Sequence, residues 1–514
     1  MNRSEQFRRL VCTDAIRRDL RSRSVRAAGF TWAAGVADFV FRIASTAILA
    51  RLILPQQFGL VMMVTAVTAV ADQFRDLGLS TATVQRKEIT HQQVTNLFWI
   101  NVFAGVGIAL MIAAVSPLVS AYYQEPSLTP ITCILATNFV WGGLVVQHEA
   151  LLARTLKLGH IAVVRVLSSI ISVIVAVVLA CNGFGYWALV WKEVVRWALL
   201  TIGMWICLPW LPGLPDRNTN VKGLIHFGAH LSAANIVVSI TAGADRFLLG
   251  KFWGAGAVAL YRQAYQLLVL PMDQLLGPVF QVTQPGLSML QTEDSKYRQF
   301  YQKVLTVVCI ATMPVSLFVA ATATEITTVL LGPKWLECTG VLVILSLGTF
   351  IREPVRWSAH VLITRGNSRR YLQMTVLQNV TLVVFMLIGV RWGIKGLATA
   401  DVMATYLLAV PITYLSLKGS PVTMGIFSAT VARPAVASLV MALVVILLHQ
   451  SLPSTGALAF LLLAGAVAAG SFVGIWMLLP GGKTELAGLV ADVRTAVQRR
   501  SVVAKPVEPV AVAS

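Results

Sequence analysis

Runs of about twenty apolar residues recur along almost the whole chain. Short connections that contain Pro, Gly, Asn or charged residues separate them. A run of that length spans the hydrocarbon core of a bilayer as an α-helix. The pattern therefore predicts fourteen transmembrane helices, with expected ranges of 27–53, 57–82, 96–117, 128–152, 160–181, 187–209, 223–249, 257–289, 302–325, 338–362, 371–391, 396–417, 428–449 and 456–479.

The composition supports a membrane protein. Hydrophobic residues make up 57% of the 514 residues and charged residues only 12%, whereas soluble domains carry about 25% charged residues. This number of polar side chains is too small to cover a globule of this size. The apolar residues must therefore face lipid. The fold class we expect is an all-α polytopic membrane protein.

The net charge of +19 is concentrated at the ends and in alternate connections. A basic arm at 1–26 holds eight arginines, and the connections expected on the same side hold most of the remaining Lys and Arg. This asymmetry predicts that both termini are cytoplasmic. Because the charge flanks membrane spans, it does not indicate a nucleic-acid partner.

Six cysteines lie far apart, and no cluster of Cys and His has the spacing of a metal site. The sequence also contains no nucleotide-binding motif. We therefore expect no metal, no cofactor and no enzymatic activity.

The chain aligns with itself at an offset of about 200 residues, as internal repeats do. Leu49–Leu60 matches Leu249–Leu260, and Asp72-Gln73-Phe74 matches Asp273-Gln274-Leu275. These matches predict a duplicated six-helix unit, with parallel repeats. The expected domains are the arm at 1–26, an N-lobe at 27–209, a C-lobe at 210–420, two further helices at 421–480 and a cytoplasmic tail at 481–514.

Several short motifs resemble the Wzx-type polysaccharide flippases, in the lipopolysaccharide and exopolysaccharide branch of the multidrug/oligosaccharidyl-lipid/polysaccharide exporter superfamily. They are Leu54-Pro55-Gln-Gln-Phe58-Gly59-Leu60, Gln85-Arg-Lys-Glu-Ile89, Phe98-Trp99-Ile-Asn101, Phe227-Gly228, Asp245-Arg246-Phe-Leu-Leu-Gly250, Leu260-Tyr261-Arg-Gln-Ala264, Leu270-Pro271, Pro285-Gly-Leu-Ser288 and Leu331-Gly-Pro-Lys-Trp335. One departure is Ala-Val-Ala at 257–259, where the family often has a small residue and Gly.

The resemblance implies fourteen helices in two lobes and an alternating-access flippase for undecaprenyl-pyrophosphate-linked oligosaccharide. Its partners would be that lipid-linked oligosaccharide, membrane lipid and polysaccharide polymerase machinery, with coupling to a proton or sodium gradient. Two alternatives stay open: a cation-coupled multidrug antiporter of the same superfamily, and a membrane glycan polymerase or ligase.

Charged residues inside the spans are functional candidates because burying a charge in a bilayer is costly. Arg352 and Arg356 lie four residues apart, on one face of a helix, while Glu353 is rotated by about 100°. Two guanidiniums without an intervening carboxylate predict a phosphate or acidic-sugar ligand, with ion pairs to acids on other helices as the alternative. The further substrate-binding candidates are Arg42, Arg196, Lys192, Arg262, Trp191 and Trp141.

Ion coupling needs acids, and the candidates are Asp38, Asp72 and Asp273. Asp38 and Arg42, Asp72 and Arg75, and Glu193 and Arg196 are also spaced for local ion pairs, so a purely structural role stays open. Pro271, Pro278 and Pro285 recur every seven residues in one span, where each removes a backbone donor. They predict a flexible helix, with simple packing as the alternative.

Overall fold

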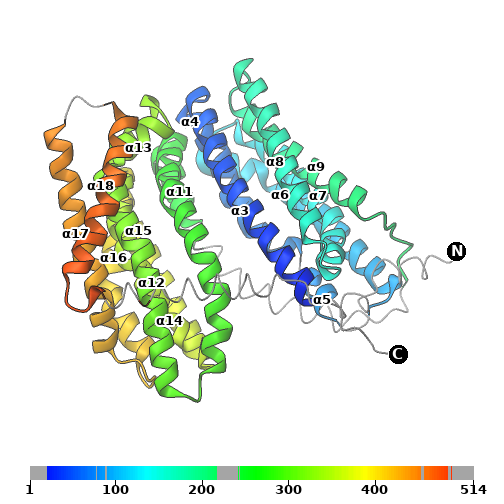
Figure 1. The fold of residues 1–514 in the computed structure, drawn as a ribbon. Coiled ribbons are helices and arrows are strands. Elements are labelled where there is room, and N and C mark those ends of the chain that lie inside the picture. Colours follow the sequence, from blue (N-terminus) through cyan, green and yellow to red (C-terminus); the bar gives the residue numbers. More distant parts are fainter. Residues whose placement is uncertain are drawn as a thin grey trace, which may run out of the picture. The chain divides into compact units, whose positions relative to one another are not determined.

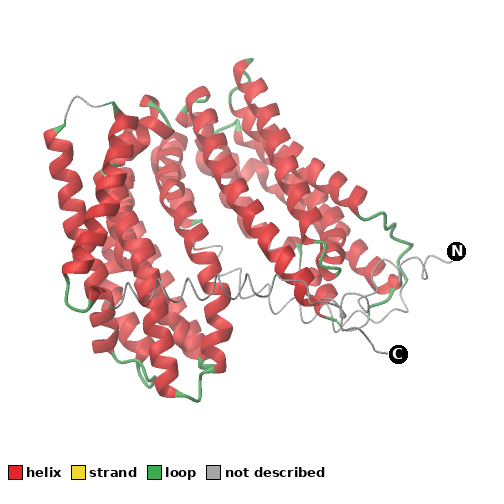
Figure 2. Cartoon of the chain, viewed as in Figure 1, coloured by secondary structure: helices red, strands yellow, loops and turns green. Residues whose placement is uncertain are grey.

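The computed structural model of the chain describes residues 20–76, 78–86, 89–216, 241, 243–452, 456–483 and 488. Helices account for nearly all of these residues, and no strand occurs among them (Figure 2). Most of the basic arm at 1–26, the predicted span 223–249 up to residue 240 and most of the tail at 481–514 lie outside the described residues.

The helices of the first half follow the predicted spans closely (Figure 1). They are α3 (Leu20–Leu52), α4 (Pro55–Arg75), α5 (Leu79–Gln85), α6 (His91–Tyr123), α7 (Leu128–Arg154), α8 (Leu158–Cys181) and α9 (Tyr186–Cys207). Local signals set several of their ends. Pro55 begins α4, and Thr90 and Gln93 cap α6 with a reciprocal pair of hydrogen bonds, as a capping box does.

The second half is also helical. Its elements are α11 (Ala244–Met289), α12 (Asp294–Ala321), α13 (Ala323–Leu330), η1 (Pro333–Cys338), α14 (Thr339–Thr364), α15 (Ser368–Gly389), η2 (Val390–Trp392), α16 (Gly393–Leu417), α17 (Met424–Ser451) and α18 (Ala457–Leu478). From α14 on, the long helices match the predicted spans within about four residues, whereas α12 begins eight residues before the predicted 302.

One predicted boundary needs correction. The span expected at 57–82 ends at Arg75, because Gly78 adopts a φ of 67° and a new short helix, α5, follows. The break expected between 249 and 257 is confirmed, because Gly254, with a φ of 77°, is non-helical and separates the two helical segments of α11. Glycine adopts such positive φ values without the steric cost that other residues bear.

The chain divides into two compact units that do not follow the predicted lobes. Unit 1 comprises Met1–Gly277, Ile326–Gly348 and Arg369–Leu408, and unit 2 comprises Pro278–Glu325, Thr349–Ser368 and Ala409–Ser514. The division into an N-lobe at 27–209 and a C-lobe at 210–420 stays a prediction.

Within unit 1, small residues let helices approach closely. A Cβ on Gly105 of α6 would lie 2.4 Å from the Phe139 carbonyl oxygen, and one on Gly143 of α7 would lie 2.6 Å from that of Asn101. Helix pairs in membranes often use such contacts. In the same unit α8 packs along α9 and α3 packs on α8. In unit 2, α12 packs against α17, which packs against α18.

Nine helical segments of the described residues are long and apolar enough to cross a membrane. One of them, 368–417, joins two predicted spans. The helix α9 is absent from this set because Lys192, Glu193 and Arg196 lie within it. The chain is therefore an all-helical, multi-pass membrane protein, and its charged helices are of particular interest.

Candidate functional site

Five helices of unit 1 place ionisable side chains around two adjoining pockets. The larger pocket has a volume of about 420 Å³ and the smaller about 300 Å³. The larger is lined by Gly35, Asp38, Arg42, Arg75, Glu149, Ala162, Arg165, Val166, Ser168, Ser169, Arg196, Trp197 and Leu200. The smaller is lined by Asp38, Phe41, Arg42, Ser45, Ser169, Ser172, Val173, Lys192, Glu193 and Arg196. The two share Asp38, Arg42, Ser169 and Arg196, so they form one polar cavity.

Ion pairs fix several of the lining side chains. Arg42 Nη2 lies 2.7 Å from Asp38 Oδ2, one helical turn apart on α3. Arg165 of α8 pairs with Glu149 of α7 and so joins two helices. These charged ends are one-quarter or more exposed within unit 1, which keeps them accessible to a ligand.

Glu193 is held by two cations of its own helix. Its Oε2 accepts hydrogen bonds from the Arg196 guanidinium at 2.8 and 3.1 Å, and its Oε1 lies 3.5 Å from Lys192 Nζ. The Glu193–Arg196 pairing anticipated from the sequence is thus present. The same holds for Asp72, which lies 3.1 Å from Arg75 Nη1.

Trp197 stands between two arginines at the wall of the larger pocket. The Cζ atoms of Arg75 and Arg196 lie 4.3 and 5.1 Å from its ring centroid, within the range of a cation–π interaction. Arg75 reaches this position across Gly142, where an added Cβ would be 2.3 Å from Arg75 Cδ. A side chain at 142 would therefore displace the guanidinium.

The cavity carries more positive than negative charge. Its cationic lining residues are Arg42, Arg75, Arg165, Lys192 and Arg196, and its acidic ones are Asp38, Glu149 and Glu193. Asp72 is not a lining residue but pairs with Arg75, so five cations are set against four anions, an excess of one positive charge. In a membrane-spanning unit an uncompensated charge is costly, so this arrangement favours an anionic ligand.

The structure brings together only part of the predicted site. Arg42, Arg196, Lys192 and Asp38 meet in the cavity. Trp191 is exposed at 43%, and neither Trp191 nor Trp141 is among the described residues that line the two pockets. Asp273 is exposed on α11. Substrate-binding and ion-coupling roles for these residues stay predictions.

The geometry predicted for the arginines of α14 is wrong. Arg356 Nη2 lies 2.9 Å from Glu353 Oε2, so a carboxylate does lie beside this guanidinium. Glu353 is rotated by about 100° from Arg352 but only about 60° from Arg356, three residues on. A substrate-binding role for Arg352 and Arg356 is still a prediction, but it can no longer rest on their lacking a neighbouring acid.

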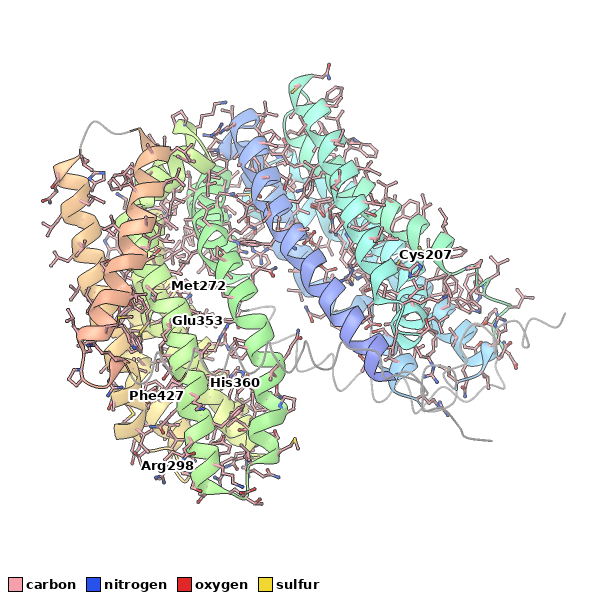
Figure 3. The ribbon with its side chains drawn as sticks, viewed as in Figure 1. Cys207, Met272, Arg298, Glu353, His360 and Phe427 are labelled. Atoms are coloured by element: carbon pink, nitrogen blue, oxygen red, sulfur yellow. The ribbon has the colours of Figure 1, made fainter. Side chains whose placement is uncertain are left out.

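Arg356 also belongs to an aromatic cluster in unit 2. The rings of Phe280, Trp357 and His360 contact one another, with pairwise centroid distances of 4.8 to 5.2 Å. Trp357 is 1% exposed, and Arg356 Cζ lies 5.1 Å from the Phe280 ring. Figure 3 labels Glu353 and His360 on α14. This cluster resembles a packed core more than a ligand cavity.

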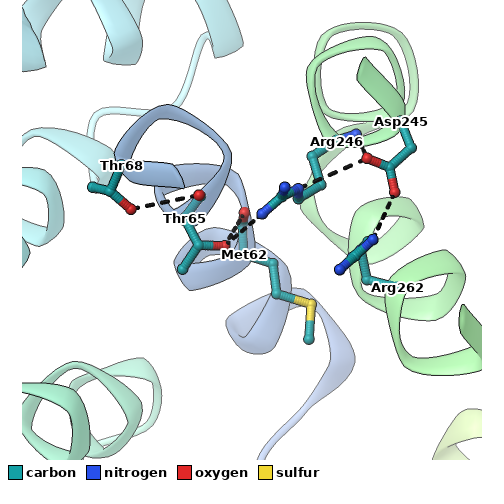
Figure 4. Close-up of polar contacts among 6 residues, drawn as sticks. All are labelled: Met62, Thr65, Thr68, Asp245, Arg246 and Arg262. Atoms are coloured by element: carbon teal, nitrogen blue, oxygen red, sulfur yellow. Dashed lines mark hydrogen bonds and ion pairs between the residues drawn. The ribbon is translucent and has the colours of Figure 1, made fainter. Parts of the chain in front are cut away.

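Arg262 lies in a second buried ionic cluster of unit 1 (Figure 4). Its Nη1 is 3.2 Å from Asp245 Oδ2, and the Arg246 Nε is 3.7 Å from Asp245 Oδ1. Arg246 also donates a hydrogen bond to Thr65 of α4 at 3.3 Å. Asp245 precedes the kink at Gly254 and Arg262 follows it, so the pair links the two segments of α11.

The three prolines leave α11 helical, since Gly254 is its one residue with non-helical φ and ψ. Pro271 belongs to unit 1 and Pro285 to unit 2, and the units divide between Gly277 and Pro278. A hinge role for Pro271, Pro278 and Pro285 stays a prediction.

The helix α4 faces the charged cavity on one side and an apolar groove on another. Arg75 lines the larger pocket, whereas Ala71 and Phe74 line a groove of about 450 Å³. Side chains of α6 such as Met111 and Leu118 form its other wall. One helix thus separates a charged surface from an apolar one.

Asp38, Arg42 and Arg196 of the larger pocket were predicted site residues, but Arg75, Glu149 and Arg165 were not. Arg75 was anticipated only as a local ion-pair partner, and the Arg165–Glu149 pair was not anticipated. Their contacts join α4 to α9 and α8 to α7. Ion pairs within one helix are readable from spacing, but contacts between helices depend on their rotation and crossing.

The chain is similar to proteins of polysaccharide biosynthesis. Residues 48–340 match the family model described as "Polysaccharide biosynthesis protein". The lipopolysaccharide biosynthesis protein WzxC of Escherichia coli (strain K12) is 26% identical over 340 residues, which cover 65% of this chain and 68% of that protein. The succinoglycan biosynthesis transport protein ExoT of Rhizobium meliloti (strain 1021) is 23% identical over 331 residues, 64% of this chain and 67% of that protein.

A third relative is the teichuronic acid biosynthesis protein TuaB of Bacillus subtilis (strain 168), with 23% identity over 303 residues, 59% of this chain and 63% of that protein. Among solved structures, the inward closed lipid II flippase MurJ matches with a TM-score of 0.68 and 13% identity, covering 88% of this chain and 97% of that one. An inward-facing MATE family multidrug transporter matches with a TM-score of 0.57 and 13% identity, covering 76% and 94%. At such low identity these structures establish the fold alone.

Proposed function

The chain belongs to the polysaccharide biosynthesis protein family, and on this premise we propose that it is a flippase for lipid-linked oligosaccharides. Its substrate would be an undecaprenyl-pyrophosphate-linked repeat unit, which it moves across the membrane for polysaccharide biosynthesis. The names of its relatives, which include a lipopolysaccharide biosynthesis protein and a succinoglycan transport protein, support this class of substrate.

The observation that carries the proposal is the convergence of four guanidinium groups on the larger pocket, in a polar cavity of unit 1 whose cations outnumber its acids. A pyrophosphate that links a lipid to a sugar carries two negative charges near neutral pH. Guanidinium groups bind phosphate oxygens through paired, charge-assisted hydrogen bonds. Arg42, Arg75, Arg165 and Arg196 approach the larger pocket from four helices, so they could surround such a group.

The headgroup would therefore cross in the polar cavity while the polyprenyl tail stays in lipid. We propose fourteen transmembrane helices in two lobes that alternate access to this cavity, in a bacterial inner membrane with both termini cytoplasmic. Nothing in the mechanism requires a chemical step. We further propose that transport is coupled to a proton or sodium gradient through Asp38, Asp72 or Asp273. The translocated repeat unit would then pass to a polysaccharide polymerase.

Depletion of the protein in its native host tests the function. Undecaprenyl-linked repeat units should accumulate in the inner leaflet of the inner membrane, and surface polysaccharide should fall. Re-expression of the wild-type chain should reverse both effects. Unchanged lipid-linked intermediates together with altered drug tolerance would contradict the proposal and favour a multidrug antiporter.

A further inference from the structure

We propose that the two adjoining pockets bind different parts of one substrate: the larger takes the diphosphate and the smaller takes the first sugar of the glycan. This assignment rests on the proposed function and adds to it a carbohydrate subsite centred on Glu193. The two parts of the substrate are covalently joined, so their pockets must adjoin. The shared lining residues Asp38, Arg42, Ser169 and Arg196 meet that requirement.

The number of guanidinium groups separates the two pockets. The larger is lined by four guanidiniums, whereas the smaller is lined by two guanidiniums and one ammonium group. Arg75 and Arg165 line only the larger pocket, and each pairs with an acid, Asp72 and Glu149, so the pockets differ in hydrogen-bond donors and not in net charge. Because guanidinium forks suit phosphate oxygens, the diphosphate is assigned to the larger pocket.

The smaller pocket also carries hydrogen-bond acceptors that suit a sugar. The hydroxyls of Ser45 and Ser172, which line the smaller pocket, donate to the backbone carbonyls of Arg42 and Ser169 at 2.9 and 2.8 Å. The proton of each hydroxyl is engaged in that hydrogen bond, so toward a ligand the hydroxyl oxygen can only accept. Phosphate oxygens are acceptors and gain nothing from these groups. Sugar hydroxyls can donate to them.

Glu193 supplies a fixed carboxylate that can also accept hydrogen bonds from sugar hydroxyls. Lys192 and Arg196 hold it from both oxygens, so it accepts from neighbouring sugar hydroxyls without first being ordered. Phe41 adds an apolar surface for a sugar ring. In the larger pocket the aromatic Trp197 already has two guanidiniums against its ring, so a sugar cannot readily stack there.

Two lipids separate the contributions of the pockets in binding assays on the purified full-length protein. One is geranylgeranyl diphosphate, which has the diphosphate but no sugar. The other is the lipid-linked oligosaccharide fraction that accumulates in depleted cells. Glu193→Gln should weaken binding of the glycosylated lipid about tenfold, the loss expected for one charge-assisted hydrogen bond. Its affinity for geranylgeranyl diphosphate should stay equal or rise, because a negative charge is removed.

Glu149→Gln is the matched control, since it removes a carboxylate that lines only the larger pocket. It should leave the ratio of the two affinities unchanged. A loss of equal size for both lipids in Glu193→Gln, or no loss for either, would overturn the sugar subsite. If the wild-type protein binds neither lipid, the proposed function itself fails, which is a different outcome.

A second pair of variants keeps the charges intact, in case Glu193→Gln does not fold. Ser172 and Ser168 are both buried on α8, and both donate to backbone carbonyls. Ser172 lines the smaller pocket and Ser168 the larger. Ser172→Ala should lower the affinity for the glycosylated lipid several-fold relative to the affinity for geranylgeranyl diphosphate. Ser168→Ala should leave this ratio unchanged. Equal ratios in the two variants would contradict the proposal.

Discussion

Two regions of the molecule place arginine beside glutamate at the same helical spacing, and they differ in what surrounds the pair. Glu193 and Arg196 of α9 line a polar cavity to which α3, α4, α7 and α8 also contribute charged or hydroxyl side chains. Glu353 and Arg356 of α14 lie beside a stack of aromatic rings that includes the fully buried Trp357.

The comparison shows that arginine spacing along one helix does not identify a ligand site. An i, i+3 neighbour can neutralise an arginine locally, as Glu353 does for Arg356. In the cavity, by contrast, cations from α3, α4, α8 and α9 meet in one place, and the sequence of a single helix does not reveal this convergence. Convergence between helices, rather than local spacing, distinguishes the candidate binding site.

The largest expected effect comes from removing cations that line only the larger pocket. Arg75→Gln combined with Arg165→Gln should reduce polysaccharide export by at least about a hundredfold, because two charge-assisted hydrogen bonds to phosphate are lost. Export is measured as surface polysaccharide at matched protein levels. Arg365→Gln, which breaks the Arg365–Asp294 ion pair of unit 2, is the control and should export normally. Near-normal export by the double variant would remove the cavity from the mechanism.

A second prediction moves Arg75 without changing a charge. Gly142→Ala places a methyl group where Arg75 Cδ lies, so the guanidinium must leave the Trp197 ring, and export should fall about tenfold, roughly one charged hydrogen bond. Gly107→Ala on α6, where an added Cβ meets nothing within 4 Å, should behave as wild type. If the two Ala variants export equally, the position of Arg75 is unimportant.

A third pair of variants tests the α14 region. Arg356→Gln removes a partner of Glu353, which is 6% exposed, and should lower the amount of folded protein several-fold, since a buried charge loses its counter-ion. Glu353→Gln combined with Arg356→Gln removes both charges and should recover folding and export. Folded protein is measured by gel filtration of the detergent extract. A double variant that folds but does not export would instead support the sequence-based assignment of Arg356 as a phosphate ligand.

The smallest effect is expected for Asp38→Asn. Asp38 and Arg42 form an accessible pair one turn apart, and such pairs contribute less than about 1 kcal/mol to stability. The thermal unfolding midpoint should therefore barely change. If Asp38 is the coupling acid, transport by the variant should become insensitive to collapse of the proton or sodium gradient. A large fall in the midpoint would mean that Asp38 is mainly structural.

Much of the fold could be predicted from the sequence because each span is a local signal. The apolar runs near 128–152 and 160–181 correspond to α7 and α8 within two residues at each end, and pairings such as Asp38–Arg42 follow from helical spacing. The residues of the cavity could be anticipated only in part. The contact of Arg165 with Glu149 and the path of Arg75 over Gly142 depend on how the helices rotate and pack against one another. The sequence of a single segment does not encode this.

Site-specific photocrosslinking on α8 tests the central claim most directly. A photoreactive amino acid at position 169, shared by both pockets, should capture the lipid-linked oligosaccharide in living cells. The same group at position 163, which is 44% exposed on α8 and lines neither pocket, should not. A glycolipid adduct at 169 alone is the predicted result. Adducts at 163 alone, or at neither position while export proceeds, would contradict a polar cavity in unit 1 as the path of the headgroup.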